Sequence, residues 1–250
     1  MRLIQSLFLI PLILSCQPKS AQEVTIRAVD RSSLPKEAAL ALVTPTDELR
    51  SGENELRFKV ASYELGVPTA SSRASELANS PKGQHIHHIL DNAPYMARYH
   101  ERLTLDLDTG NHVLLSFLSR SYHESIKSSD AFVIRQFQVS NKGEANYDLE
   151  RGKHLFYSRP KGNYIIRAGL SGSILLDFYL LNTNLEDGSY IKAVLNGKTF
   201  ILKEWKPYFI DGLGLGEHTL SLQLMNQAGK PIEGPFNYSG NRKFTISQTK

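Results

Sequence analysis

Residues 83–118 read GQHIHHILDNAPYMARYHERLTLDLDTGNHVLLSFL, and residues 188–224 read GSYIKAVLNGKTFILKEWKPYFIDGLGLGEHTLSLQL. The two stretches share one pattern at an offset of about 105 residues. Leu-Asp-Asn at 90–92 matches Leu-Asn-Gly at 195–197, and Gly-Asn-His at 110–112 matches Gly-Glu-His at 216–218. A repeat of this length is too long for a solenoid unit and has the size of one β-sandwich domain. The sequence therefore predicts a duplicated domain.

Apolar residues around these stretches come in short runs with a period of two, for example at 55–65, 112–118 and 174–181. Gly, Pro, Asn and Asp separate the runs. Asn196-Gly197 is typical of a two-residue hairpin turn, because both positions must take a positive φ. Short alternating runs with frequent turns indicate antiparallel strands. We predict an all-β fold of two tandem Ig-like antiparallel β-sandwich domains.

The composition excludes several other classes of protein. The 250 residues are 41% hydrophobic and 22% charged, which is ordinary for a globular chain and argues against disorder or a collagen-like structure. A single Cys rules out an internal disulfide and a multi-Cys zinc site. The net charge of +4 is spread along the chain without a basic block, so we expect no nucleic-acid partner.

The first sixteen residues, MRLIQSLFLIPLILSC, have one basic residue and then an apolar run too short to span a bilayer. Ile13-Leu14-Ser15-Cys16 resembles the lipobox of bacterial lipoproteins. The resemblance implies cleavage before Cys16, acylation of this residue and a stable anchor in a membrane. Gln17, where an Asp would suggest inner-membrane retention in some bacteria, favours the outer membrane. The expected location is thus the bacterial cell envelope; the alternative is an ordinary secretory signal.

These observations divide the chain into five segments. We expect a cleaved lipoprotein signal peptide at 1–15, a lipidated tether at 16–23, an N-terminal His-containing β-sandwich at 24–140, a polar linker at 141–153 and a C-terminal β-sandwich repeat at 154–250.

The sequence His85-Ile86-His87-His88 lies on a predicted strand, where His85 and His87 share one face. Comparison with the second repeat predicts that His88 points into the core, and that His85 and His87 point outward or toward a long loop. Two His at this spacing can bind Zn²⁺ or Cu²⁺ if a third ligand is present. The candidates are His123 and Glu124, with His100 as a less favoured alternative. The alternatives are hydrogen-bonding His on a half-exposed sheet and recognition of an anion.

An anion site is predicted from basic residues near these His. Arg120 and Lys127 share a loop with His123, and Arg98 lies on a neighbouring strand in sequence order. Arg forms bidentate bonds to phosphate oxygens, and a protonated His adds a donor. The alternative interpretation is that these are solvated loop charges.

Other features have structural interpretations. His112 and His218 begin equivalent strands in the two repeats, so we expect them, like His88, to be structural and to pin a corner of each sandwich. The first repeat contains an eighteen-residue loop at 66–83, where the second has only seven residues, and long loops in compact domains are often functional.

The order Gly-x-His-x-His-x-x-x-Asp at 83–91, Leu-x-x-Gly-x-His at 107–112 and His123 resembles a His-rich bacterial β domain of unknown function. The segments SRSYHES at 119–125 and HLFYSRP at 154–160 are similar to uncharacterised bacterial lipoproteins, which are sometimes called phosphopeptide-binding. This chain lacks the Pro that members carry after the loop His and at the Gly110 corner. The resemblance implies a fold and a location but no established activity.

We therefore expect a membrane-anchored, non-catalytic module that binds a ligand or metal through His85 and His87. The alternatives are a structural or assembly subunit of an envelope complex, a phosphate- or phosphopeptide-binding module, and a hydrolase with an unrecognised site. The hydrolase motifs are incomplete: Gly-Leu-Ser-Gly-Ser at 169–173 lacks the final Gly of G-x-S-x-G. No catalytic residue is predicted.

Overall fold

The structure, a computed structural model, describes residues 23–33, 35, 37–139, 151–166 and 172–248. It is almost entirely β, with one single-turn helix, α1 (Arg73–Glu76). The strands of the N-terminal half are β1 (Thr25–Ala28), β2 (Ala39–Leu42), β3 (Gly52–Ala61), β4 (His85–Leu90), β5 (Met96–Arg98), β6 (Arg102–Leu107), β7 (Gly110–Ser119) and β8 (Phe132–Val139). Those of the C-terminal half are β9 (His154–Arg159), β10 (Gly162–Ile166), β11 (Ile174–Leu181), β12 (Tyr190–Leu195), β13 (Lys198–Leu202), β14 (Tyr208–Asp211), β15 (Gly216–Met225) and β16 (Arg242–Gln248).

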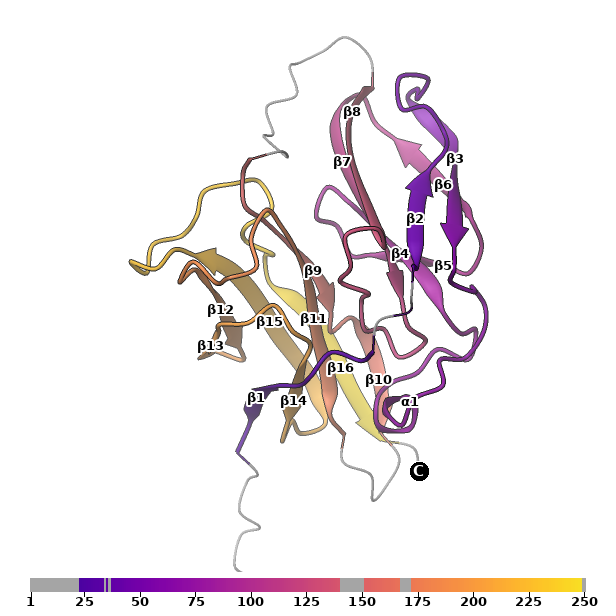
Figure 1. The fold of residues 1–250 in the computed structure, drawn as a ribbon. Coiled ribbons are helices and arrows are strands. Elements are labelled where there is room, and N and C mark those ends of the chain that lie inside the picture. The colour runs from indigo at the N-terminus through magenta and orange to yellow at the C-terminus, as the bar shows by residue number, and fades with distance from the viewer. Residues whose placement is uncertain (1–22, 34, 36, 140–150, 167–171, 249–250) are drawn as a thin grey trace, which may run out of the picture.

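The strands form two β-sandwiches that lie side by side (Figure 1). In the first, the sheet β2-β3-β6 packs on the sheet β5-β4-β7-β8. In the second, the sheet β1-β14-β11-β9 packs on β10-β16-β15-β12-β13. All pairings are antiparallel except that of β10 with β16. The predicted all-β fold of two tandem sandwiches is confirmed.

The first strand crosses from one half to the other. β1 pairs with β14, from Thr25 opposite Asp211 to Ala28 opposite Tyr208, and so completes a sheet of the C-terminal sandwich. The strands of the N-terminal sandwich therefore begin at β2, later than the expected start at residue 24. Residues 29–33, here called the strap, run from one sandwich to the other (Figure 1).

The repeat is visible in the strand pairs. The hairpin turn after β4 has positive φ at Asp91 and Asn92, and the turn after β12 has it at Asn196 and Gly197. In each half the strand before the turn also pairs with the strand that begins at the Gly-x-His corner, with Leu90 of β4 opposite Leu114 of β7 and Leu195 of β12 opposite Leu220 of β15. These two strand pairs thus have equivalent registers in the two halves.

The outer face of the β4–β7 sheet is buried against the other sandwich. Ile89, Val113, Leu115 and Phe117 of the first half form one apolar cluster with residues of the second half, namely Phe156, Tyr179 and Phe236. Strands β4 and β7 are therefore buried on both faces, since Ile86, Leu114 and Leu118 lie in the core of the first sandwich. His85 and His87 share the face of Ile89 and are fully buried, so the outward direction expected for them is wrong. The other expected direction, toward the long loop, holds for His85, which contacts Gly83 at the end of that loop.

The predicted signal peptide, Cys16, nearly all of the tether and most of the linker at 141–153 lie outside the described residues. Within the ranges that are described, no helix is long and apolar enough to span a membrane.

Candidate metal centre

Three His side chains converge where the two sandwiches meet. His85 and His87 come from one face of β4, and His123 comes from the loop that follows β7. One ring nitrogen of each lies within 4.8 Å of the other two. The Nε2 atom of His85 is 2.9 Å from Nε2 of His87 and 3.1 Å from Nδ1 of His123. The structure thus brings together three of the four metal ligands predicted from the sequence.

Backbone contacts fix the orientation of His85. Its Nδ1–H donates to the carbonyl of Gly83 at 2.8 Å, which leaves a lone pair on Nε2. Gly83 has a φ of 85°, and a Cβ there would lie 2.5 Å from the backbone of Val67. Only glycine allows this close approach between β4 and the long loop, so the long loop holds His85 in place.

The C-terminal sandwich orients His87. The Oγ atom of Ser158, on β9, lies 3.3 Å from Nδ1 of His87. The ring of Tyr95 stacks on the same imidazole at 3.7 Å between centroids, and Phe117 contacts it edge-on at 5.3 Å. His87 is therefore held by both halves of the molecule.

His123, the third residue of the His cluster, has an uncommon backbone conformation. Its φ of 70° places it in the left-handed region, which is uncommon for a residue with a side chain and is often found at functional positions. His123 is only partly buried, whereas His85 and His87 are fully buried. The cluster is thus most accessible from the side of His123.

Burial keeps the three imidazoles neutral. It lowers the pKa of His85 to about 4, with the positive charge of Arg159 contributing in the same direction. Burial also holds the pKa values of His87 and His123 well below the usual range, and the neighbouring His and Arg159 add to the effect. Neutral imidazole is the form that binds metal ions.

The arrangement fits a cation better than a set of hydrogen bonds. The single lone pair on Nε2 of His85 accepts one strong hydrogen bond, yet two ring nitrogens approach it. Three nitrogens bound at about 2.0–2.1 Å to a tetrahedral Zn²⁺ lie about 3.3 Å apart. To reach this geometry, the two contacts of His85 Nε2 at 2.9 and 3.1 Å need to lengthen slightly. The ligand nitrogens of His87 and His123, which lie within 4.8 Å of each other, need to settle at the same separation, and a three-His site with a fourth position open then results.

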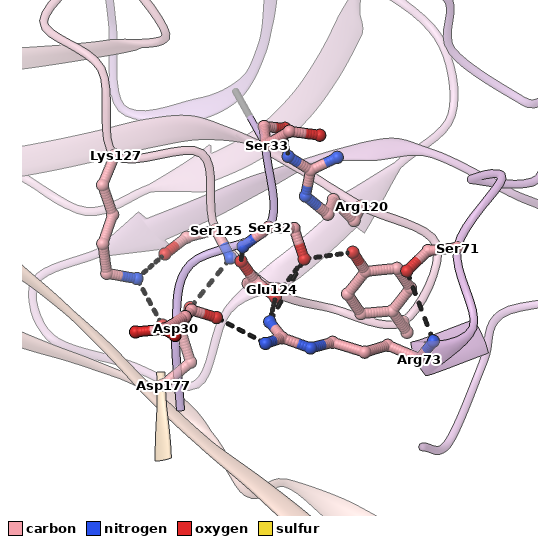
Figure 2. Close-up of polar contacts among 11 residues, drawn as sticks. Asp30, Ser32, Ser33, Ser71, Arg73, Arg120, Glu124, Ser125, Lys127 and Asp177 are labelled. Carbon is pink, nitrogen blue, oxygen red and sulfur yellow. Dashed lines mark hydrogen bonds and ion pairs between the residues drawn. The ribbon is translucent and has the colours of Figure 1, made fainter. Parts of the chain in front are cut away.

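Glu124, the fourth predicted ligand, is not part of the cluster and lies against Ser32 and Arg73 (Figure 2). Its carboxylate accepts hydrogen bonds from the backbone N–H and the hydroxyl of Ser32 and pairs with Arg73 at 2.7 Å. It therefore holds the strap against α1. The prediction of Glu124 as a ligand is wrong because adjacent residues in this loop point in different directions.

The basic residues predicted to bind an anion have separate structural roles. Arg120 donates to the backbone carbonyl of Ser33 in the strap, and Lys127 pairs with Asp177 at 2.5 Å (Figure 2). Arg98 donates to the carbonyl of Ala97. Arg120 and Lys127 are thus buried and engaged with these partners, and the anion site as predicted is not formed.

His88 lies on the opposite face of β4, as expected. Its Nδ1 atom is 2.8 Å from the Oγ of Ser116, and its ring packs at 4.8 Å from Phe58. Burial lowers its pKa to about 3, so it is a neutral core residue.

His112 and His218 occupy the same corner in each sandwich. Nδ1 of His112 contacts Asp91 at 2.6 Å and Nε2 contacts a backbone carbonyl at 3.0 Å. Nδ1 of His218 contacts Asn196 at 2.8 Å and Nε2 contacts the carbonyl of Gly214 at 2.9 Å. Each His thus ties its strand to the preceding hairpin turn.

Three residues near the cluster were not predicted from the sequence, namely Tyr95, Ser158 and Arg159. Tyr95 and Ser158 contact His87, and Arg159 lies 5.4 Å from the Tyr95 ring. Ser158 and Arg159 belong to the other sandwich, and no local pattern indicates which residues of one domain meet the other.

Comparisons with known proteins give no family. No family model and no curated protein matches the chain. Among solved structures, the fibronectin(III)-like modules of Clostridium thermocellum CbhA are 11% identical over 84% of this chain and 94% of that chain, with a TM-score of 0.29. Latent PorU from Porphyromonas gingivalis is 11% identical over 88% and 22% of the two chains, with a TM-score of 0.28. An ice-binding adhesin of an Antarctic bacterium is 12% identical over 92% and 49%, with a TM-score of 0.23. The fold class of this chain rests on its own sheet topology.

Proposed function

We propose that this chain is a non-catalytic, metal-binding β-sandwich module in which His85, His87 and His123 hold one Zn²⁺ or Cu²⁺ ion. The observation that carries the proposal is the convergence of three neutral ring nitrogens within 4.8 Å. An all-nitrogen ligand set suits these borderline ions better than Mg²⁺ or Ca²⁺, which prefer oxygen.

The surroundings of the site support binding more than hydrolysis. The ligands are braced by Gly83, Tyr95 and Ser158, which is the type of outer contact that orients metal-binding His. No carboxylate joins the cluster among the described residues, so no general base accompanies the ion. The positive charge of Arg159 nearby favours an anion over water as the fourth ligand.

Calorimetric titration of the purified, metal-free chain with Zn²⁺ and Cu²⁺ tests the proposal. We expect one ion per chain, and His123→Ala to weaken binding more than about 100-fold because it removes one of three ligands. His100→Ala is the matched control, since His100 is exposed and outside the cluster. Absence of binding by both ions, or equal binding by the His123→Ala variant, would contradict the proposal.

We also propose that the module is anchored to the bacterial envelope through acylated Cys16, in the outer membrane. The support is the lipobox-like sequence at 13–16 and the polar residues that follow it. Cells supplied with labelled palmitate should incorporate the label into this chain and not into the Cys16→Ser variant. Equal labelling of the variant, or an unlabelled native chain, would exclude the anchor.

A further inference from the structure

A cavity opens where the two sandwiches meet. Its volume is about 290 Å³, and Ser158, which contacts His87, forms part of its wall. The residues that matter for its chemistry are Pro94 from the first half and Tyr157, Pro160, Lys161, Arg242 and Lys243 from the second.

The charged residues of this cavity are all cations. Lys161 donates to the carbonyl of Tyr95 at 2.5 Å and lies 4.3 Å from the ring of that residue. Arg242 donates to the backbone carbonyl of Asn92. In the described part of the chain, neither Lys161 nor Arg242 has a carboxylate within 4.0 Å, whereas Lys243 pairs with exposed Glu217 at 3.0 Å.

A second guanidinium, that of Arg159, lies behind the cavity. Arg159 is only 6% exposed and donates to the carbonyl of Lys161 at 3.2 Å and to the hydroxyl of Tyr164 at 3.0 Å. The Nε atoms of both Arg159 and Arg242 are buried without a hydrogen-bond partner among the described residues. Buried positive charge without a counter-charge is costly, so this region is poised to take up an anion.

The remaining wall is apolar. Tyr157, Pro94 and Pro160 provide surfaces for a small hydrocarbon or aromatic group, and the hydroxyl of Tyr157 already donates to Pro160. We propose that this cavity binds a small organic anion, whose carboxylate or phosphate-type group is held by Lys161 and Arg242 while its apolar body lies against Tyr157 and the prolines.

The titration behaviour of the two cations agrees with this assignment. Burial, and next the charge of Arg159, lower the pKa of Lys161, and burial lowers the pKa of Arg242. A bound anion would offset both effects.

Calorimetry of the metal-free chain with benzoate, phenylphosphonate and uncharged benzamide tests the proposal. We expect at least one of the two anions to bind, its identity separating a carboxylate from a phosphate-type ligand, and benzamide to bind at least about tenfold more weakly. No binding of either anion, or equal binding of benzamide, would overturn the assignment. Because the metal is absent, the result does not depend on the three-His site.

Variants assign the binding to these residues. Lys161→Gln and Arg242→Gln should each weaken anion binding about tenfold or more, since each removes a charge-assisted hydrogen bond. Lys192→Gln is the matched control, because Lys192 is exposed on β12 and does not line the cavity. Lys161→Gln remains informative if Arg242→Gln unfolds. Equal weakening by Lys192→Gln would show a general effect of net charge and contradict the proposal.

Discussion

At the scale of single residues, the molecule buries an unusual number of imidazoles. His85, His87 and His88 are fully buried on one strand, and His123 joins two of them from a neighbouring loop. Burial lowers the pKa of all four below the usual value, mainly because the charged form loses its hydration. In the unfolded chain the same side chains titrate near the ordinary His value of about 6.5.

The difference between the pKa values of these His in the folded and unfolded states predicts that the metal-free chain loses stability at acid pH. Below about pH 6.5 the unfolded state binds protons that the folded state does not, so stability is complete above that pH and falls as the pH drops toward the folded pKa values. The limiting slope is about 1.4 kcal/mol per pH unit for each His. Urea unfolding at pH 7.5, 6.5 and 5.5 should show a loss of more than about 2 kcal/mol over the last step. A free energy of unfolding that stays constant down to pH 5.5 would contradict this expectation.

His112 acts in the opposite direction. Burial lowers its pKa, but its contacts with Asp91 and Asp108 outweigh burial and raise the pKa overall. Its contribution is therefore present below about pH 6.5 and is lost as the pH rises through the folded value. Because four His pKa values are lowered and only that of His112 is raised, we expect the net effect to be a loss of stability at acid pH.

At the scale of elements, the two hairpin corners perform one task with different residues. Asp91 accepts from the backbone N–H of Val113 at 2.7 Å and contacts His112, and Asn196 accepts from Thr219 at 2.9 Å and contacts His218. Both turn residues have a positive φ, which Asn and Asp adopt more readily than most side chains.

The corner formed by Asn196 and His218 indicates how an Asn would behave in place of Asp91 in the other sandwich. Asp91→Asn should cost less than about 0.5 kcal/mol, because the amide makes the same two contacts that Asn196 makes, whereas Asp91→Ala should cost about 1–3 kcal/mol by leaving two polar groups unpaired. Thermal unfolding at pH 7 measures both values. Asn196→Ala is the matched control and should behave like Asp91→Ala; equal losses for Asp91→Asn and Asp91→Ala would refute the shared role.

The strands and the repeat were predictable from the sequence, whereas the contacts between the two sandwiches were not. Period-two runs and turns such as Asn196-Gly197 were sufficient for the strands and the repeat, because both depend on local geometry. The partner of β1 was not predictable, since Thr25 and Asp211 lie far apart in the chain. The burial of His85 and His87 was missed for a related reason: it depends on residues distant in the sequence, namely His123 and, from the other sandwich, Ser158. His123 joins the cluster and Glu124 does not. His123 has a positive φ, which the spacing of residues in the sequence does not predict.

At the scale of the whole molecule, polar and apolar contacts join the sandwiches. The strap is held by Glu124, Arg73 and Arg120 (Figure 2). An apolar cluster lies between the β4–β7 sheet and strands β9 and β11. Lys127 of the first half and Asp177 of the second form an ion pair whose side chains are 1% and 0% exposed. Asp177 also accepts from the backbone N–H of Ser125 at 3.0 Å.

Because Lys127 and Asp177 are buried together, we expect the effect of replacing Lys127 on stability to depend on whether Asp177 is still charged. Lys127→Met should destabilise the chain by about 3–5 kcal/mol, because it leaves the buried carboxylate of Asp177 without a counter-charge. The double variant Lys127→Met/Asp177→Asn should recover most of the loss, since the amide oxygen still accepts from Ser125. Urea unfolding of the two single variants and the double variant gives the coupling. Additive losses would mean that the pair does not link the halves.

We have proposed that His85, His87 and His123 bind one ion together. X-ray absorption spectroscopy of the Zn²⁺-loaded chain examines this binding, because multiple scattering counts the imidazoles around the ion. We expect three imidazole nitrogens at about 2.0 Å in the native chain and two in His123→Ala loaded at high Zn²⁺. A first shell of oxygen atoms without imidazole scattering, or the same spectrum for both proteins, would contradict it.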